Sequence, residues 1–269
     1  NILSPAHFDR IMAALRAQFD LSGLHEHAVE IDPRLLTAEQ AAAFARGGVN
    51  RASFGVQDLN PHVQEAIGRV QPFEVVDGAA QVLESAGVRS LNFDLMYGLP
   101  AQTIADCVES VRLAVSLGPD RLAIFGYAHV PWFKSRQKLI DAASLPDSET
   151  RLLQAEAMRN ILTEAGYVAI GFDHFARPDD PLARAAEQGG LKRNFQGYVD
   201  DPCTVLVGMG ASAISTFPQG YTQNNAEPGA WSRSNGIRAV WRRWPKSQPI
   251  IQGGSKSWRA MRSISICRP

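Results

Sequence analysis

The sequence predicts an α/β protein built on a parallel sheet. Strands and helices alternate from the start of the chain to about Phe175, at about 30 residues per strand and helix, and successive strands end in polar residues. This spacing is typical of parallel strands joined by right-handed helical crossovers. A chain of 269 residues is long enough for one α/β barrel or two ordinary domains.

Helical periodicity and end signals place the individual elements. Ser4 is a candidate N-cap before Pro5, and Thr37 opens a helix that Gly47 and Gly48 close. The predicted helices are residues 4–21, 37–48, 74–87, 102–118 and 148–166. The predicted strands are residues 27–32, 51–57, 90–98, 121–129 and 167–172.

The carboxyl ends of these strands carry the first functional candidates. In an α/β barrel the ligand-facing residues lie at those ends. A buried, unpaired carboxylate such as Asp94 costs several kcal/mol, roughly, so we expect it to have a partner or to face a cavity. Glu30 with Asp32 could instead cap the following turn, and Gln57 with Asp58 could start a loop. The polar strand ends are Glu30, Gln57, Asp94 and residues 126–129.

Residues 171–215 interrupt the alternation and are rich in charge, Gly and Pro. A long polar insertion in a regular fold favours a functional loop. His174 in this region could belong to a site or could hydrogen-bond locally. Gly208 and Gly210 allow either close approach to a ligand or a tight turn. The charged and polar side chains of the insertion include His174, Arg177, Lys192, Arg193 and Asn194.

Charge is unevenly distributed, although the formal net charge is zero. Nine Lys or Arg and no acidic residue follow Trp231, which leaves 18 basic against 27 acidic residues in residues 1–231. The basic, Trp-containing tail could bind single-stranded nucleic acid, but the acidic body beside it disfavours this. No run approaches the roughly 18 apolar residues of a membrane span, and no secretory signal is seen, so we predict a cytoplasmic protein.

The three cysteines, Cys107, Cys203 and Cys267, are far apart in the sequence. They form neither a disulfide framework nor a close-spaced metal motif. We therefore expect isolated thiols and no metal site.

Several segments together resemble a known family. The segments, in order, are VEIDP, SFGVQDLN, FDLMYGLPAQT, YAHVP, DHFARPDD, RNFQGY and GMGASAIS. They resemble the oxygen-independent coproporphyrinogen III oxidases (dehydrogenases), a radical S-adenosylmethionine (SAM) family of haem biosynthesis. The resemblance runs from residue 1 to about residue 231, and DHFARPDD and RNFQGY separate it from the related haem chaperones.

The resemblance implies a partial (β/α) TIM-like barrel of the radical SAM type. In this family a 4Fe-4S cluster on a CxxxCxxC loop binds one SAM, and a second SAM lies beside it. A 5′-deoxyadenosyl radical removes hydrogen from the β-carbon of a propionate, and loss of carbon dioxide and one electron leaves a vinyl group. Two such steps convert coproporphyrinogen III to protoporphyrinogen IX.

The resemblance also assigns cofactor-binding residues but no catalytic residue. Glu30 would hold the ribose of the first SAM, and Ile214 would line the same adenosyl site. The residues expected around the second SAM are Gln57, Arg69, Asp94 and the backbone at Ala128.

The cluster loop does not occur in this sequence, and the three cysteines cannot replace it by spacing. We therefore expect a barrel truncated at its N-terminus, catalytically inactive by itself. The expected domains are residues 1–231, with the family-specific loop 171–215, and a basic tail, residues 232–269, that is out-of-frame or disordered. Expected partners are coproporphyrinogen III and an electron donor and acceptor, for a monomer that binds neither nucleic acid nor membrane. The alternative is a haem- or porphyrin-binding module without radical chemistry.

Overall fold

The computed structural model describes residues 2–194 and 197–233. The chain divides into two compact units. Unit 1 comprises residues 1–19 and 26–200, and unit 2 comprises residues 20–25 and 201–269. Nearly all of the predicted tail, residues 232–269, lies outside the described residues.

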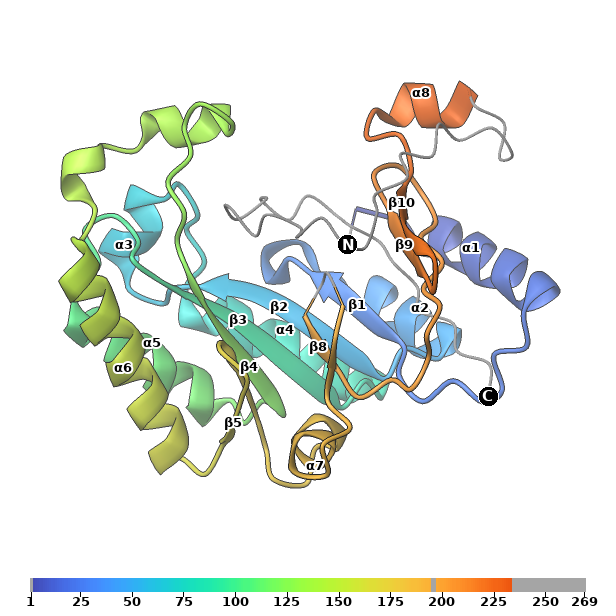
Figure 1. Ribbon diagram of the computed structural model, residues 1–269, viewed down its shortest axis with the longest axis horizontal. Helices are drawn as coiled ribbons and strands as arrows, with labels where there is room; N and C mark the ends of the chain where they lie inside the picture. Colours follow the sequence, from blue (N-terminus) through green and yellow to red (C-terminus); the bar gives the residue numbers. More distant parts are fainter. Residues whose placement is uncertain (1, 195–196, 234–269) are drawn as a thin grey trace. The chain divides into compact units, whose positions relative to one another are not determined.

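Unit 1 is built on a six-stranded, mostly parallel sheet (Figure 1). The strand order is β1-β2-β3-β4-β6-β5, with β1 to β4 parallel and β6 antiparallel to both of its neighbours. The strands are β1 (Ala28–Ile31), β2 (Arg51–Gln57), β3 (Ser90–Tyr97), β4 (Arg121–Gly126), β5 (Val168–Ile170) and β6 (His174–Ala176). The predicted α/β fold with a parallel, barrel-type sheet is confirmed.

The helices of unit 1 begin and end largely where the capping signals indicate. The Ser4 hydroxyl accepts a hydrogen bond from the His7 N–H at 3.3 Å, and Thr37 forms a capping box with Gln40. Gly48 ends α2 in a left-handed conformation, with φ of 87°. The helices are α1 (Pro5–Gln18), α2 (Ala38–Gly47), α3 (Pro61–Ala66), α4 (Phe73–Ala86), α5 (Ile104–Ser116), α6 (Ser148–Glu164) and α7 (Pro181–Glu187), with 3-10 turns at Pro33–Leu35, Ser135–Leu139 and Ala142–Ser144.

The sheet has one apolar and one polar face, because alternate residues of a strand point to opposite sides. The apolar face packs against helices, with α5 and α6 side by side (Figure 1). Phe54 and Phe93 stack there with ring centroids 5.5 Å apart, and both are fully buried. Each such ring contributes about 1.5–3 kcal/mol by its removal from water. This packing holds the strands and leaves the other face for polar side chains.

Part of the predicted insertion 171–215 is regular structure. β6 lies between β4 and β5, so residues 168–170 do not pair with β4 as a parallel continuation would. Helix α7 follows, and then β7 (Lys192–Arg193) and β8 (Tyr198–Val199) form a small antiparallel pair. Helix α3 is a further element that the periodicity did not predict, because it spans only six residues.

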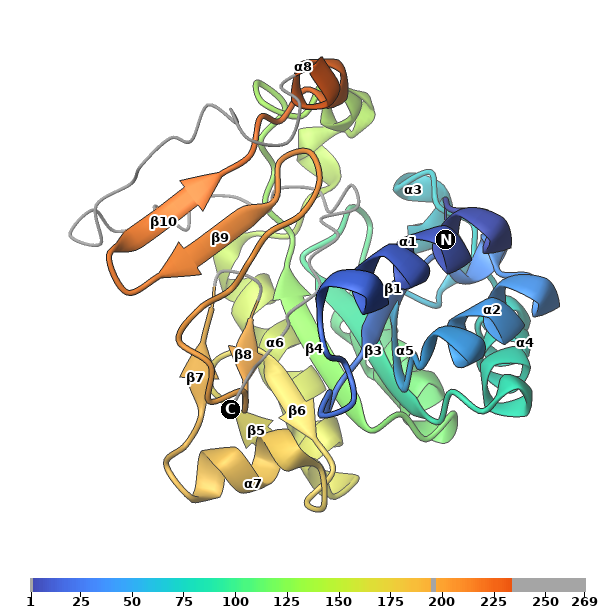
Figure 2. The ribbon, with the colours of Figure 1, turned by 90° about the vertical axis from the view of Figure 1, so that its right-hand side faces the viewer.

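Unit 2 contains an antiparallel hairpin of β9 (Ile214–Phe217) and β10 (Gly220–Gln223), followed by α8 (Pro228–Arg233) (Figure 2). Gly208 lies against this hairpin: a Cβ there would come within 2.6 Å of the Ile214 carbonyl oxygen. Asn224 Nδ2 donates to the carbonyls of Gly208 at 3.2 Å and Gly210 at 2.8 Å. The GMGASAIS glycines therefore allow the chain to approach its own backbone closely.

Cys107 is a buried free thiol, as expected. Cys203 is instead disulfide-bonded, so the prediction of an isolated thiol is wrong for that residue. In the described part of the chain, no helix combines the length and apolar character needed to cross a membrane.

Candidate functional site

The polar face of the sheet carries the candidate site. Strand pairing places Glu30 beside Ser53, and Ser53 beside Asn92. One row further along the strands, Asp94 lies between Gly55 and Ala123. Because directly paired residues share a face, these side chains all point away from the helix-covered core.

Glu30 and Asp94 form a pair of neighbouring carboxylates on this face. Asn92 Nδ2 donates to Asp94 Oδ1 at 2.9 Å and to Ser53 Oγ at 3.0 Å, and Ser53 also hydrogen-bonds Glu30. Burial raises the pKa of Asp94 to about 8, and the negative charge of Glu30 adds to the increase. Burial also raises the pKa of Glu30. The pair therefore favours a ligand that brings hydrogen-bond donors or positive charge.

Gln57 and Arg69 lie over Gly55, the cross-strand neighbour of Asp94. A Cβ at Gly55 would come within 2.8 Å of Gln57 Nε2 and 3.5 Å of Arg69 Nη2. Arg69 Nη2 donates to the Gly55 carbonyl at 2.8 Å and lies 3.8 Å from Asp32 Oδ1. Gln57 ends β2 with a φ of 69°, which turns the chain out of the sheet. The predicted residues that this arrangement brings together are Glu30, Gln57, Arg69 and Asp94.

The backbone at Ala128 is held from two sides. Gln137 Nε2 donates to the Ala128 carbonyl at 3.0 Å, and Arg151 Nη2 donates to the Tyr127 carbonyl at 2.6 Å. The segment thus has a defined course just after β4. Ile214 begins β9 of unit 2, so its predicted place in an adenosyl site stays a prediction.

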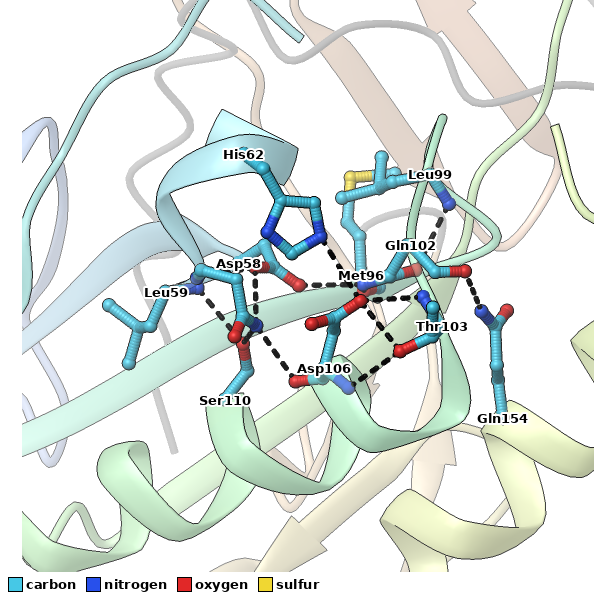
Figure 3. Close-up of polar contacts among 11 residues, drawn as sticks. Asp58, Leu59, His62, Met96, Leu99, Gln102, Thr103, Asp106, Ser110 and Gln154 are labelled. Carbon is cyan, nitrogen blue, oxygen red and sulfur yellow. Dashed lines mark hydrogen bonds and ion pairs between the residues drawn. The ribbon is translucent and has the colours of Figure 1, made fainter. Parts of the chain in front are cut away.

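A buried polar network supports the ends of β2 and β3 (Figure 3). Asp58 is fully buried and accepts hydrogen bonds from Gln102 Nε2 at 2.7 Å and from Asn60. Gln102 Nε2 also donates to the Met96 carbonyl, and Gln154 of α6 donates to the Gln102 carbonyl. Sequence reasoning considered Asp58 only as part of a loop. Its position directly after Gln57 is the signal that could have identified this support.

A second charged cluster lies on the polar face near the amino ends of β2 and β4. Asp180 accepts from Arg121 Nε at 2.8 Å and from Arg51 Nη2 at 3.2 Å. Glu26 lies 2.9 Å from Arg51 Nε and 3.2 Å from Arg121 Nη1. The sequence analysis did not identify this cluster, which fastens Asp180 of the DHFARPDD segment to the sheet.

His174 of the same segment lies on the polar face, in β6. It is paired with Ala123, and its Nδ1 lies 2.7 Å from Asp173 Oδ1. Its ring meets Phe125 edge-on, with centroids 5.9 Å apart. His174 is thus part of the sheet rather than of a loop.

The polar side chains of Glu30, Asp94 and Arg69 fit SAM. Arg69 Nε is buried and has no hydrogen-bond partner among the described residues, and burial lowers the pKa of Arg69. A guanidinium with an unpaired N–H suits a carboxylate, and the carboxylates of Glu30 and Asp94 suit hydroxyl or ammonium groups. SAM carries all three.

An iron–sulfur cluster does not fit the described residues in the same way. Within residues 2–194 and 197–233, no group of three or more His, Cys, Asp or Glu could hold a metal ion. Burial raises the pKa of Cys107 to about 12, so this thiol is not a ready ligand.

Comparison with known proteins places the chain in a family. The Radical SAM superfamily model matches residues 2–114. The oxygen-independent coproporphyrinogen III oxidase of Bradyrhizobium diazoefficiens is 52% identical over 236 residues, which are 88% of this chain and 52% of that protein. The Paracoccus denitrificans protein of the same name is 49% identical, over 85% of this chain and 51% of that protein.

A solved structure agrees with these relatives. Coproporphyrinogen III oxidase (HemN) from Escherichia coli, described as a radical SAM enzyme, superposes with a TM-score of 0.84 at 38% identity. The match covers 89% of this chain and 55% of that chain. The chain spans about half the length of the curated relatives it matches. It belongs to the oxygen-independent coproporphyrinogen III oxidases of the radical SAM superfamily.

Proposed function

We propose that this chain provides the SAM-binding barrel portion of an enzyme that converts coproporphyrinogen III to protoporphyrinogen IX in haem biosynthesis. The observation that carries the proposal is the gathering of Glu30, Asp94, Gln57 and Arg69 at one end of a radical SAM sheet. A porphyrin-binding module without radical chemistry is not favoured, because the relatives matched over most of the chain carry the oxidase name.

Each site residue has a distinct part in binding. Glu30 accepts hydrogen bonds from the ribose hydroxyls of a first SAM. Asp94, Gln57 and the backbone at Ala128 surround a second SAM. Arg69 offers its unpaired Nε to the carboxylate of that molecule.

When bound, SAM would supply the radical chemistry that removes hydrogen from the β-carbon of a substrate propionate and converts that propionate to a vinyl group, with loss of carbon dioxide and transfer of one electron to an acceptor. The protein excludes water from the site and orients SAM through the buried carboxylate pair. The 4Fe-4S cluster and the electron donor and acceptor of this reaction are expected in the complete enzyme.

Titration calorimetry with SAM tests the binding part of the proposal. We expect Glu30→Gln and Arg69→Gln in the 269-residue chain to weaken SAM binding about tenfold each, because each removes a charge-assisted hydrogen bond. Arg136→Gln, which changes an exposed cation on the Ser135–Leu139 turn, is the matched control. Equal affinity in all four proteins would contradict the assignment.

Cluster reconstitution tests the other part. The chain has only three cysteines, at positions 107, 203 and 267, and a site-differentiated cluster needs three closely grouped thiolates. We expect anaerobic treatment with iron and sulfide, followed by absorption spectroscopy and by electron paramagnetic resonance of the reduced sample, to give no stoichiometric 4Fe-4S signal and no 5′-deoxyadenosine. A stoichiometric signal would show that the ligand argument is wrong.

A further inference from the structure

Two sequence segments that distinguish this family, DHFARPDD and RNFQGY, meet around one aromatic ring. The ring of Tyr198 packs directly over Gly171, which has a φ of 59° and no side chain to obstruct it. The Phe172 N–H donates to the Tyr198 hydroxyl at 3.3 Å. The His174 ring meets the Tyr198 ring edge-on, with centroids 5.3 Å apart. We call Gly171, Asp173, His174, Arg193 and Tyr198 the Tyr198 junction.

The Tyr198 junction borders the same strip of the polar face as Asp94. Asp94 pairs with Ala123, and Ala123 pairs with His174, so the three residues form one row. Their strands, β3, β4 and β6, are neighbours in the sheet (Figure 2). Two strand spacings separate Asp94 from His174, about 10 Å between backbones. Ala123 contributes only a methyl group between them. A group held at His174 therefore lies within the reach of a small ligand bound at Asp94.

The junction presents two nitrogen-bearing side chains. His174 Nδ1 lies 2.7 Å from Asp173 Oδ1, a contact that fixes the orientation of the imidazole ring. Arg193 is exposed, and its Cζ lies 5.1 Å from the centroid of the Tyr198 ring. Tyr198 thus orients both side chains by ring contacts, although they come from different strands. An imidazole and a guanidinium oriented beside an aromatic ring suit an anionic group on an apolar body.

We propose that the Tyr198 junction binds a propionate carboxylate of the tetrapyrrole substrate, through His174 Nε2 and the Arg193 guanidinium. This inference rests on the proposed function and adds a substrate contact to it. The junction would hold the carboxylate, while SAM would lie at Asp94, at the other end of the row. His174 would then be a substrate-binding residue of the reaction, and Asp173 would position it.

Binding of coproporphyrin III to the 269-residue chain tests the inference, because this fluorescent oxidised form keeps the propionates of the substrate. Its tetra-amide, which has the same size but no carboxylate, is the comparison ligand. We expect His174→Gln and Arg193→Gln each to weaken binding of the acid about tenfold and to leave binding of the tetra-amide unchanged. His62→Gln and Arg136→Gln remove an exposed histidine paired with Asp106 and an exposed arginine, both outside the junction.

The outcomes separate this inference from the proposed function. Equal acid binding by the unmodified chain and both junction variants, or an equal loss for acid and tetra-amide, would overturn the carboxylate contact. No acid binding by the unmodified chain would also overturn it. SAM titration of the same samples judges the site at Glu30 and Asp94 independently. Since Arg193 is exposed, Arg193→Gln should fold normally, which circular dichroism can verify.

Discussion

The two charged regions of the polar face differ in how their charges are balanced. At the amino ends of β2 and β4, Arg51 and Arg121 face Glu26 and Asp180, with all four ion pairs between 2.8 and 3.2 Å. On β1 and β3, Glu30 and Asp94 face each other, and within the described residues no ion pair joins either of them to a cation. The first region pairs its two cations with two carboxylates, although Arg51 Nη1 and Arg121 Nη2 have no hydrogen-bond partner among the described residues. The second region holds two carboxylates and, in the described part of the chain, no cation paired with them.

This difference indicates which region is built for a ligand. Opposite charges in a buried cluster compensate one another. Removing one partner destabilises the fold, because it leaves the other charge buried without compensation. Two like charges in a buried pair raise the pKa of the carboxyl groups. Such a pair lacks nearby positive charge and hydrogen-bond donors, which a ligand can supply. The same face of one sheet thus carries a structural charge cluster and the proposed binding site, and the following changes test that division.

The largest expected effect is on stability, at the amino-end cluster. Asp180→Ala removes the buried carboxylate that pairs with both guanidinium groups and leaves them only the more exposed Glu26, so we expect the free energy of unfolding to fall by about 3–5 kcal/mol. Denaturant unfolding followed by circular dichroism measures this loss. Asp9→Ala, which breaks the exposed pair with Arg46 at 3.0 Å, is the control and should cost about 1 kcal/mol or less. Similar losses in both variants would show that burial does not distinguish the cluster.

Asp94→Asn should act on ligand binding instead. The change removes one charge-assisted hydrogen bond to SAM, so we expect binding to weaken by about 1.5–3 kcal/mol in titration calorimetry. Stability should not fall, because the substitution also removes the repulsion from Glu30. Asp141→Asn, at an exposed 3-10 cap, is the matched control. Unchanged affinity with a large loss of stability would make Asp94 a structural residue.

The pH dependence of stability should show the carboxylate pair directly. The pKa of Asp94 is raised from 3.8 to about 8, so between these values the folded protein holds a proton that the unfolded chain releases. The contribution of Asp94 to stability is therefore present at low pH and is lost as pH rises toward 8. One such proton gives a slope of at most about 1.4 kcal/mol per pH unit. Asp94→Asn should flatten this slope in denaturant unfolding at pH 5 to 8; an identical slope would contradict the raised pKa.

The smallest expected effect concerns Gly55. An added methyl group would displace Gln57 Nε2, the end of a flexible side chain, and would lie in ordinary van der Waals contact with Arg69 Nη2. We expect Gly55→Ala to weaken SAM binding by about 1 kcal/mol, roughly fivefold, with little change in stability. Gly78→Ala on α4, where nothing lies within 4 Å of the added carbon, is the control for SAM titration and thermal unfolding. An affinity equal to that of the control would place Gln57 outside the site.

Local sequence patterns determined the alternating strands and helices and the helix ends. Ser4, Thr37 and Gly48 act through neighbours within a few residues, so their roles are visible in the sequence. The polar strand ends Glu30, Gln57 and Asp94 could be predicted as site residues for a similar reason, because parallel strands place their carboxyl ends at one edge. Arg69 and Ala128 followed from family resemblance and not from a local pattern.

Only the tertiary structure decided which distant residues meet. Arg51 and Asp180 are 129 residues apart, and no local period relates them. The insertion of β6 between β4 and β5 brings His174 into the row of Asp94, although its segment reads as a polar loop. Asp58 looks like a turn residue until the packing of α5 and α6 buries it among amide donors. Such contacts depend on the pairing of strands and helices across the whole sheet, which a pattern of neighbouring residues cannot specify.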